Sequence, residues 1–187
     1  LTNYCFPAFV ISPVIFYRQN NHFMHIYTTK SGYKLIQILS GRCNVFLLTD
    51  GNKNILIDTS SKRHRNKLAD NLKNMGVDKI DLLILTHTHF DHAGNVEFIK
   101  RNYHAAVIVH SYEAGCLAKG KNPFTKGTIF PANILSSLFM EKILSKLSYS
   151  PCKPDILAED KYPLTEYGLN AYLLHTPGHS VGSMSLI

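Results

Sequence analysis

Long apolar runs, internal repeats and paired cysteines are all missing from this 187-residue sequence. No apolar stretch reaches the roughly 18 residues that a membrane-spanning helix needs, so no membrane partner is expected. The four cysteines are widely scattered, and none forms a C-x-x-C pair. This spacing argues against a zinc ribbon and against a disulfide framework. We therefore expect a cytoplasmic protein with reduced thiols at Cys5, Cys43, Cys116 and Cys152.

Acidic residues are also few: 13 Asp and Glu stand against 20 Lys and Arg, which gives a formal net charge of +7. The basic residues are spread from Arg18 to Lys161, and their densest run, from Lys62 to Lys67, falls on a predicted surface helix. Such a run is typical of a solvated face. A nucleic-acid partner is therefore not favoured, although charge alone does not exclude it, and we expect a small-molecule substrate. The oligomeric state cannot be derived from the sequence.

The beginning of the chain predicts an extension rather than part of the main fold. The first residue is Leu, and the apolar stretch that follows is interrupted by Pro7 and Pro13, which makes it a poor secretory signal. The regular strand pattern begins at Met24, a candidate for the true start. We therefore expect residues 1–23 to be an upstream extension or an accessory strand, and residues 24–187 to form the domain.

Strand and helix patterns alternate along this domain. The order is strands, then alternating helix and strand, then strands again, which is typical of a layered α/β (α+β) protein. The chain stops within an apolar strand pattern, so we expect the domain to continue downstream. The patterns predict strands near 25–29, 35–39, 44–49, 54–58, 81–86, 105–110, 170–175 and 182–187, helices over 62–75, 94–102, 111–118 and 133–148, and a loop over 119–131.

One short segment places four potential metal ligands directly after the predicted buried strand at 81–86. His87 and His89 are two residues apart, so an extended backbone projects both to the same side. Asp91 and His92 are adjacent and need a turn, which can aim them at a second position. Imidazole and carboxylate are ligands that zinc accepts, and we do not expect so dense a group to be a set of surface histidines.

A second candidate follows the predicted strand at 170–175. Pro177 and Gly178 predict a tight turn that presents His179 beyond the strand. His175 is the other possible ligand there, but its place in the strand pattern favours a structural role. His110, at the end of its own strand, is also expected to be structural.

Together these motifs resemble the metallo-β-lactamase-fold hydrolases. The resemblance rests on His-x-His-x-Asp-His at 87–92, on Thr-Pro-Gly-His-Ser-x-Gly-Ser at 176–183 and on Ile-Leu-Ile-Asp-Thr at 55–59. It extends over about residues 24–187. It implies a four-layer αββα sandwich with metals at one edge, of which the C-terminal part is missing from this chain.

The resemblance also implies roles for individual residues. His87, His89 and His179 would hold a first metal, and Asp91 and His92 would bind a second. The expected metal is Zn²⁺, two ions per site in the complete protein, with Fe or Mn as alternatives. Asp91 would also be the catalytic residue that orients the attacking water and accepts its proton.

Further residues follow from the same family pattern. Asp58 is implied to orient the metal-binding loop, a role that suits a carboxylate beside ligating histidines. Ser60 departs from the Gly of many relatives. The Asp that bridges both metals and a final His are absent, since both would follow Ile187. Without them the second site is incomplete, so we expect a longer protein.

Hydrolysis of a thioester, lactone or other ester is the expected reaction, because Asp-His-Ala-Gly at 91–94 resembles hydroxyacylglutathione hydrolases and lactonases. An RNA or DNA phosphodiesterase of the same fold is the catalytic alternative. A second alternative is a non-catalytic or degenerate metal-binding module. Phe124, Phe130 and Tyr149 are candidates for lining a substrate pocket.

Overall fold

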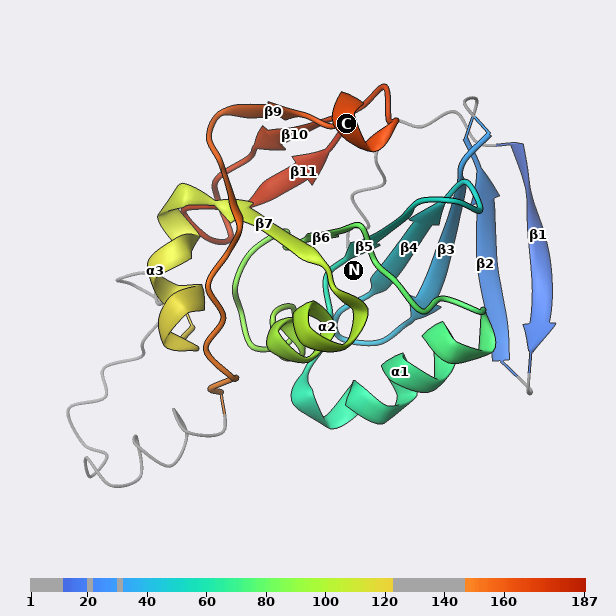
Figure 1. The fold of residues 1–187 in the computed structure, drawn as a ribbon, viewed down its shortest axis with the longest axis horizontal. Helices are drawn as coiled ribbons and strands as arrows, with labels where there is room; N and C mark the ends of the chain where they lie inside the picture. Colours follow the sequence, from blue (N-terminus) through green and yellow to red (C-terminus); the bar gives the residue numbers. More distant parts are fainter. Residues whose placement is uncertain (1–11, 20–21, 30–31, 123–146) are drawn as a thin grey trace.

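An eight-stranded sheet forms the frame of the protein (Figure 1). The computed structural model describes residues 12–19, 22–29, 32–122 and 147–187. Neighbouring strands run antiparallel from β1 to β5 and parallel from β5 to β8. In spatial order the strands are β1 (Ser12–Gln19), β2 (His22–Thr28), β3 (Lys34–Leu39), β4 (Val45–Thr49), β5 (Asn54–Ile57), β6 (Leu82–Ile84), β7 (Ala106–His110) and β8 (Ile156–Ala158).

A smaller antiparallel sheet in the order β11-β10-β9 packs on one face of the large one. The helices α1, α2 and α3 pack on the opposite face, whereas η2 lies with the small sheet. None of the described helices is long and apolar enough to cross a membrane. The small sheet contains β9 (Lys161–Pro163), β10 (Tyr172–His175) and β11 (Met184–Leu186), and the helices are η1 (Lys62–His64), α1 (Arg65–Asn74), α2 (Val96–Tyr103), α3 (Ser111–Lys119) and η2 (Thr165–Tyr167).

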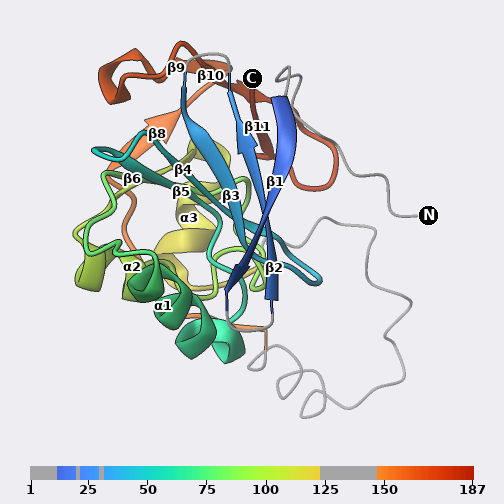
Figure 2. The same ribbon diagram turned by 90° about the vertical axis from the view of Figure 1, so that its right-hand side faces the viewer.

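The layers follow from the alternation of side chains along the central strands. In β6 and the residue after it, Leu83 and Leu85 pack with the buried residues of α1 and α2, whereas Leu82 and Ile84 pack with those of the small sheet. All four side chains are at most 1% exposed, because β6 is covered on both faces. Figures 1 and 2 show the same order, with α1 and α2 on one side of the large sheet and β9 to β11 on the other.

Most of the predicted elements are present. The strands from 25–29 to 105–110 and the last two are found within three residues of their predicted bounds, as are the helices at 62–75, 94–102 and 111–118. The residues Asp50-Gly51-Asn52 predict a turn between β4 and β5. In the structure Oδ1 of Asp50 holds this turn, because it accepts from the N–H groups of Asn52 and Lys53 at 2.8 and 2.7 Å. The predicted helix over 133–148 and the loop over 119–131 lie largely outside the described residues.

Three strands were not assigned from the sequence pattern. β8 and β9 have three residues each, too few to show a period, and they form because β7 and β10 offer them pairing edges. β1 falls within residues 1–23, the segment expected to be an extension or an accessory strand, and pairs antiparallel with β2.

Gly94 allows two loops of the frame to cross closely, and this gives a first prediction. An ideal Cβ at Gly94 would lie 2.6 Å from the carbonyl oxygens of Phe90 and Ser60 and 2.7 Å from the backbone nitrogen of Lys62. Backbone atoms cannot move aside as a flexible side chain would, so Gly94→Ala is expected to lower the free energy of unfolding by about 1–3 kcal/mol. Urea denaturation measures the change.

Gly115 provides a matched control for this substitution. It is exposed in the interior of α3, and a Cβ there would meet no atom within 4 Å. Gly115→Ala is therefore expected to stabilise the protein by about 0.5–1 kcal/mol, the usual gain of Ala over Gly in a helix. Equal effects of the two substitutions would contradict the steric explanation.

Candidate metal centre

The site lies where the parallel strands β5, β6 and β7 end. Because parallel strands bring their carboxyl ends to the same edge of a sheet, the residues that follow them gather there. Asp58 follows β5, the loop from Thr86 to His92 follows β6, and His110 ends β7. The hairpin between β10 and β11 reaches the same edge from the small sheet, since Met184 donates its backbone N–H to the carbonyl of Thr86 at 2.9 Å.

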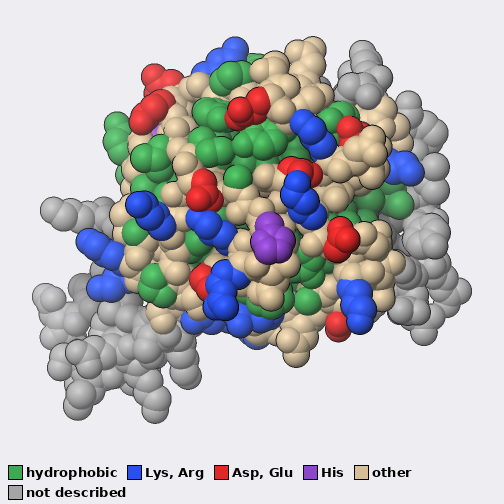
Figure 3. All heavy atoms as spheres, viewed as in Figure 1, with side chains coloured by type: hydrophobic (Ala, Val, Ile, Leu, Met, Phe, Trp, Pro, Cys, Tyr) green, Lys and Arg blue, Asp and Glu red, His purple; other side chains and the backbone are tan. Residues whose placement is uncertain are grey.

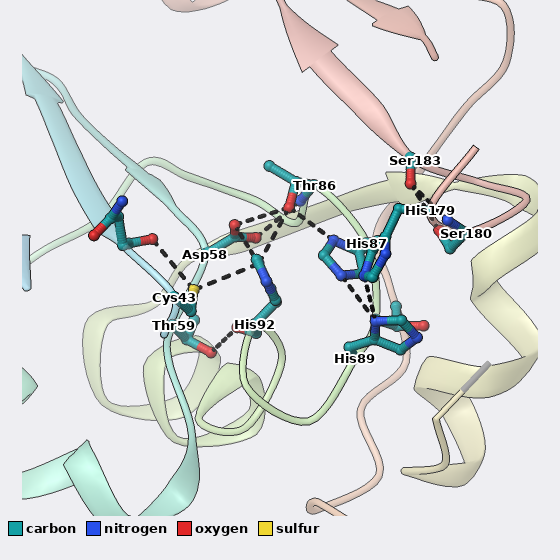
Figure 4. Close-up of polar contacts among 12 residues, drawn as sticks. Cys43, Asp58, Thr59, Thr86, His87, His89, His92, His179, Ser180 and Ser183 are labelled. Carbon is teal, nitrogen blue, oxygen red and sulfur yellow. Dashed lines mark hydrogen bonds and ion pairs between the residues drawn. The ribbon is translucent and has the colours of Figure 1, made fainter. Parts of the chain in front are cut away.

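Three imidazoles from two separate turns converge at this edge (Figure 4). Nδ1 of His89 lies 3.1 Å from Nε2 of His87 and 3.0 Å from Nε2 of His179. One nitrogen from each ring lies within 4.8 Å of the others. His87 is buried, His89 is partly buried and His179 is exposed. The structure therefore brings together the three residues that the resemblance implies as ligands of a first metal.

Electrostatics keep the innermost of these rings neutral. Burial, followed by repulsion from His92, lowers the pKa of His87 to about 3. Its imidazole is therefore uncharged at neutral pH and retains a lone pair. This is the form in which His binds a metal.

The three nitrogens fit a divalent ion. A tetrahedral zinc ion holds imidazole nitrogens at about 2.0–2.1 Å, which separates two of them by roughly 3.3 Å. The observed separations of 3.0 and 3.1 Å differ from this by a few tenths of an ångström. Both the imidazole donor set and its spacing therefore suit a metal.

Asp58 organises the loop beside this cluster. Its carboxylate accepts from Nδ1 of His92 at 2.8 Å and from the N–H and hydroxyl of Thr86 at 2.9 and 2.8 Å. Burial alone would raise the pKa of Asp58, but pairing with His92 and these hydrogen bonds hold it below its usual range. For His92 burial opposes protonation, yet the Asp58 carboxylate raises its pKa. Because Nδ1 of His92 is engaged with Asp58, a metal would have to take Nε2.

The backbone conformation at Ser60 explains why Gly suits this position. Asp58 and Ser60 both adopt the left-handed conformation, with φ of 60° and 58°. This conformation costs an ordinary L-residue about 1–2 kcal/mol and a glycine almost nothing, which is why Gly suits this position. In this chain the hydroxyl of Ser60 lies 2.9 Å from Nδ1 of His64, a contact that Gly could not make.

Asp91 is the predicted ligand that the structure does not place in a tight group. It is partly buried beside His92, but among the described residues it belongs to neither group of three whose donor atoms lie within 4.8 Å of one another. It still acts on the site electrostatically, because its charge contributes to raising the pKa values of His92 and Cys43.

The second such group contains a residue that the sequence did not indicate. Sγ of Cys43 lies 3.4 Å from Nδ1 of His92, and Cys43, Asp58 and His92 form a cluster. Nδ1 already donates to Asp58, and burial, then repulsion from Asp58 and Asp91, raises the pKa of the Cys43 thiol. We therefore interpret this group as a hydrogen-bond network behind the site. Cys43 reaches it through the loop between β3 and β4, and no motif marks that contact.

His110 and His175 have the structural positions expected of them. Nδ1 of His110 accepts from the N–H of Tyr112 at 3.2 Å and so caps α3. The rings of His110 and His175 stack with their centroids 3.9 Å apart. Nε2 of His175 lies 2.8 Å from the carbonyl oxygen of Val181, so it supports the turn that carries His179. Neither ring belongs to the three-histidine group.

Comparison with known proteins identifies relatives of the same architecture. A family model of the metallo-beta-lactamase superfamily matches residues 40–187. The chain is 34% identical over 137 residues to a Methanocaldococcus jannaschii protein named "Probable metallo-hydrolase", with 73% of this chain and 58% of that protein covered. It is 26% identical over 156 residues to a human acyl-coenzyme A thioesterase, with 78% and 53% covered.

Solved structures agree with these sequence matches. The metallo-beta-lactamase GOB-18 of Elizabethkingia meningoseptica superposes with a TM-score of 0.63 at 26% identity, covering 82% of this chain and 52% of that one. The chain thus spans a little more than half the length of the curated relatives that it matches. The expected α/β sandwich is confirmed, and the chain belongs to the metallo-beta-lactamase superfamily.

Proposed function

We propose that this chain carries the metal-binding part of a zinc-dependent hydrolase. The observation that carries the proposal is the convergence of His87, His89 and His179 from two turns, with nitrogens 3.0 and 3.1 Å apart. In this proposal these three residues hold the first ion, and Asp91 and His92 contribute to a second. The family is metal-dependent, while zinc rather than iron or manganese is inferred from the imidazole-rich donor set.

The chain's own residues prepare the site for hydrolysis. When bound, a divalent ion supplies Lewis acidity and lowers the pKa of a water molecule towards about 7. Neutral His87 offers its lone pair without first losing a proton. Asp58 engages Nδ1 of His92, so that Nε2 is the nitrogen left to bind a metal. Asp91 is proposed to orient the attacking water and accept its proton at a carboxylate oxygen.

A thioester, lactone or other ester is the proposed substrate class. Support comes from the human relative named acyl-coenzyme A thioesterase. The phosphodiesterase alternative was suggested only by the net charge. On the face shown in Figure 3, the Lys and Arg side chains are interspersed with those of Asp and Glu.

Activity on a defined substrate panel tests this proposal. The full-length protein is incubated with an acyl-coenzyme A, a homoserine lactone, a β-lactam and a bis-nitrophenyl phosphodiester. Turnover of the thioester or lactone at least about tenfold above that of the phosphodiester is expected. Preferential phosphodiester cleavage would replace the proposal by the nuclease alternative.

Metal removal gives a second prediction. Treatment with a chelator is expected to abolish hydrolysis, and about two equivalents of Zn²⁺ should restore it, because both ions of such a site take part. Metal content is measured by inductively coupled plasma mass spectrometry. Full activity in metal-free protein, or a purified protein that binds no metal, would favour the degenerate module instead.

A further inference from the structure

Glu113 is a buried carboxylate that the metal-binding motifs do not include. It lies in the first turn of α3 and is 0% exposed. A carboxylate out of contact with water is costly unless hydrogen bonds satisfy its oxygens. Its partners therefore show what the residue is for.

Those partners come from both of the turns that carry the three histidines. Oε2 of Glu113 accepts from the backbone N–H of Thr88 at 3.1 Å and from the hydroxyl of the same residue. Oε1 accepts from the backbone N–H of Gly182 at 3.2 Å. Thr88 stands between His87 and His89, and Gly182 is the third residue after His179. One carboxylate thus joins the two halves of the site.

We propose that Glu113 is the positioning residue that sets the distance of His179 from His87 and His89. The inference rests on the proposed function, since it assumes that these three imidazoles hold a metal. Glu113 acts through Thr88 and Gly182 and does not touch the metal itself. Each of its oxygens holds one turn, so loss of either bond removes this link between the two turns.

The packing around Glu113 supports a fixed arrangement. Ideal Cβ geometry at Gly182 would place that atom 2.5 Å from Cγ of Glu113 and 3.3 Å from Cβ of His110, so a larger residue would push the turn away. On the other side, the hydroxyl of Tyr149 donates to the carbonyl of Thr88 at 2.9 Å. The backbone of Thr88 is therefore held at both its N–H and its carbonyl. Tyr149, expected as a possible pocket residue, is buried and supports the loop instead.

Metal coordination allows little variation in ligand positions, which explains why Glu113 would have to hold the two turns together. His87 and His89 share one loop, so their spacing is set locally, whereas His179 arrives from the other sheet. Ligands must be held within about 0.5 Å of their working positions. The backbone bond from Met184 to Thr86 joins the sheets at the start of β11, and Glu113 joins them at Gly182, two residues closer to His179.

Metal affinity in the Glu113→Gln variant tests the proposal. The amide keeps the size of the side chain but turns one acceptor into a donor, which faces an N–H of Thr88 or Gly182. Zn²⁺ affinity, measured by competition with a chromophoric chelator in the full-length protein, is expected to fall about 10- to 100-fold, as for other residues that orient ligands. The visible absorption of the Co²⁺-substituted protein should change as well, because it reports the ligand geometry.

Two further variants make the result decisive. Glu97→Gln is the matched control: Glu97 lies in the first turn of α2 and pairs with Arg101 on the surface, so affinity and spectrum should be unchanged. Thr88→Val removes only the hydroxyl bond at a fully buried position, and a smaller loss of affinity in the same direction is expected. It provides the measurement should Glu113→Gln not fold.

The outcomes separate this proposal from the function on which it rests. Wild-type protein that binds no Zn²⁺, or a His179→Ala variant with unchanged affinity, overturns the proposed metal site. Wild-type affinity and an unchanged Co²⁺ spectrum in Glu113→Gln or, if that variant does not fold, in Thr88→Val overturn the positioning role while leaving the metal site intact. An altered Co²⁺ spectrum together with weakened Zn²⁺ binding in Glu113→Gln supports the positioning role of Glu113.

Discussion

His179→Ala is expected to weaken Zn²⁺ binding by more than about 100-fold, because it removes a ligand rather than a residue that orients one. Hydrolysis should fall with it. The stability of the fold should not change, because the side chain of His179 is exposed and buries little surface. We expect the free energy of unfolding of the metal-free protein to change by less than about 0.5 kcal/mol, as for other surface substitutions. Chelator competition and urea denaturation measure the two effects separately.

Val181→Ala is the matched control in the same turn. Val181 is 53% exposed, and the carbonyl oxygen that His175 contacts belongs to its backbone, which the substitution keeps. Zn²⁺ affinity should therefore equal that of the wild type. Parallel losses in both variants would mean that any change in this turn disturbs the site, and the specific role of the His179 imidazole would be refuted.

Asp91→Asn is expected to lower kcat by about 100- to 10,000-fold, the usual contribution of a positioned proton acceptor. The amide keeps the size of the side chain but cannot take up a proton at neutral pH. It is also a poorer metal ligand, so occupancy of the second ion should fall. The free energy of unfolding should change by less than about 1 kcal/mol, because Asp91 is only partly buried. Steady-state kinetics with excess Zn²⁺ and metal analysis test both statements.

Asp70→Asn is the control for the change of charge. Asp70 lies on the exposed face of α1, where the same substitution should leave kcat unchanged. A kcat of Asp91→Asn within about threefold of the wild-type value would contradict the proposed proton transfer, since even weak general-base catalysis exceeds that factor.

The sequence was sufficient for the family and for most of the frame. Periodic patterns predicted the central strands, and Asp50-Gly51 followed by Asn52 predicted the turn between β4 and β5. The dense group from His87 to His92 indicated the site because so many ligand types rarely occur together by chance. The structure places His179 against it. The assignment of each ligand to a metal stays a prediction.

The remaining features depend on contacts between distant segments, which no local pattern encodes. β8 has three residues and is a strand only because β7 lies beside it. Cys43 looked like an ordinary buried thiol, yet the loop after β3 brings it to His92, 49 positions away in the sequence. Glu113 looked like an acidic residue in the first turn of a helix, which is common on surfaces. Its burial depends on packing against two turns that follow other strands.

The close backbone crossing at Gly94 changes how the segment from Asp91 to Gly94 should be interpreted. The absence of a side chain at this position is demanded by the carbonyl oxygens of Phe90 and Ser60, whatever the substrate is. A tetrapeptide whose last member is fixed by the frame is a marker of ancestry and carries little information on specificity. We expect substrate preference to be encoded in side chains that contact the bound substrate, and comparisons among relatives should be restricted to those positions.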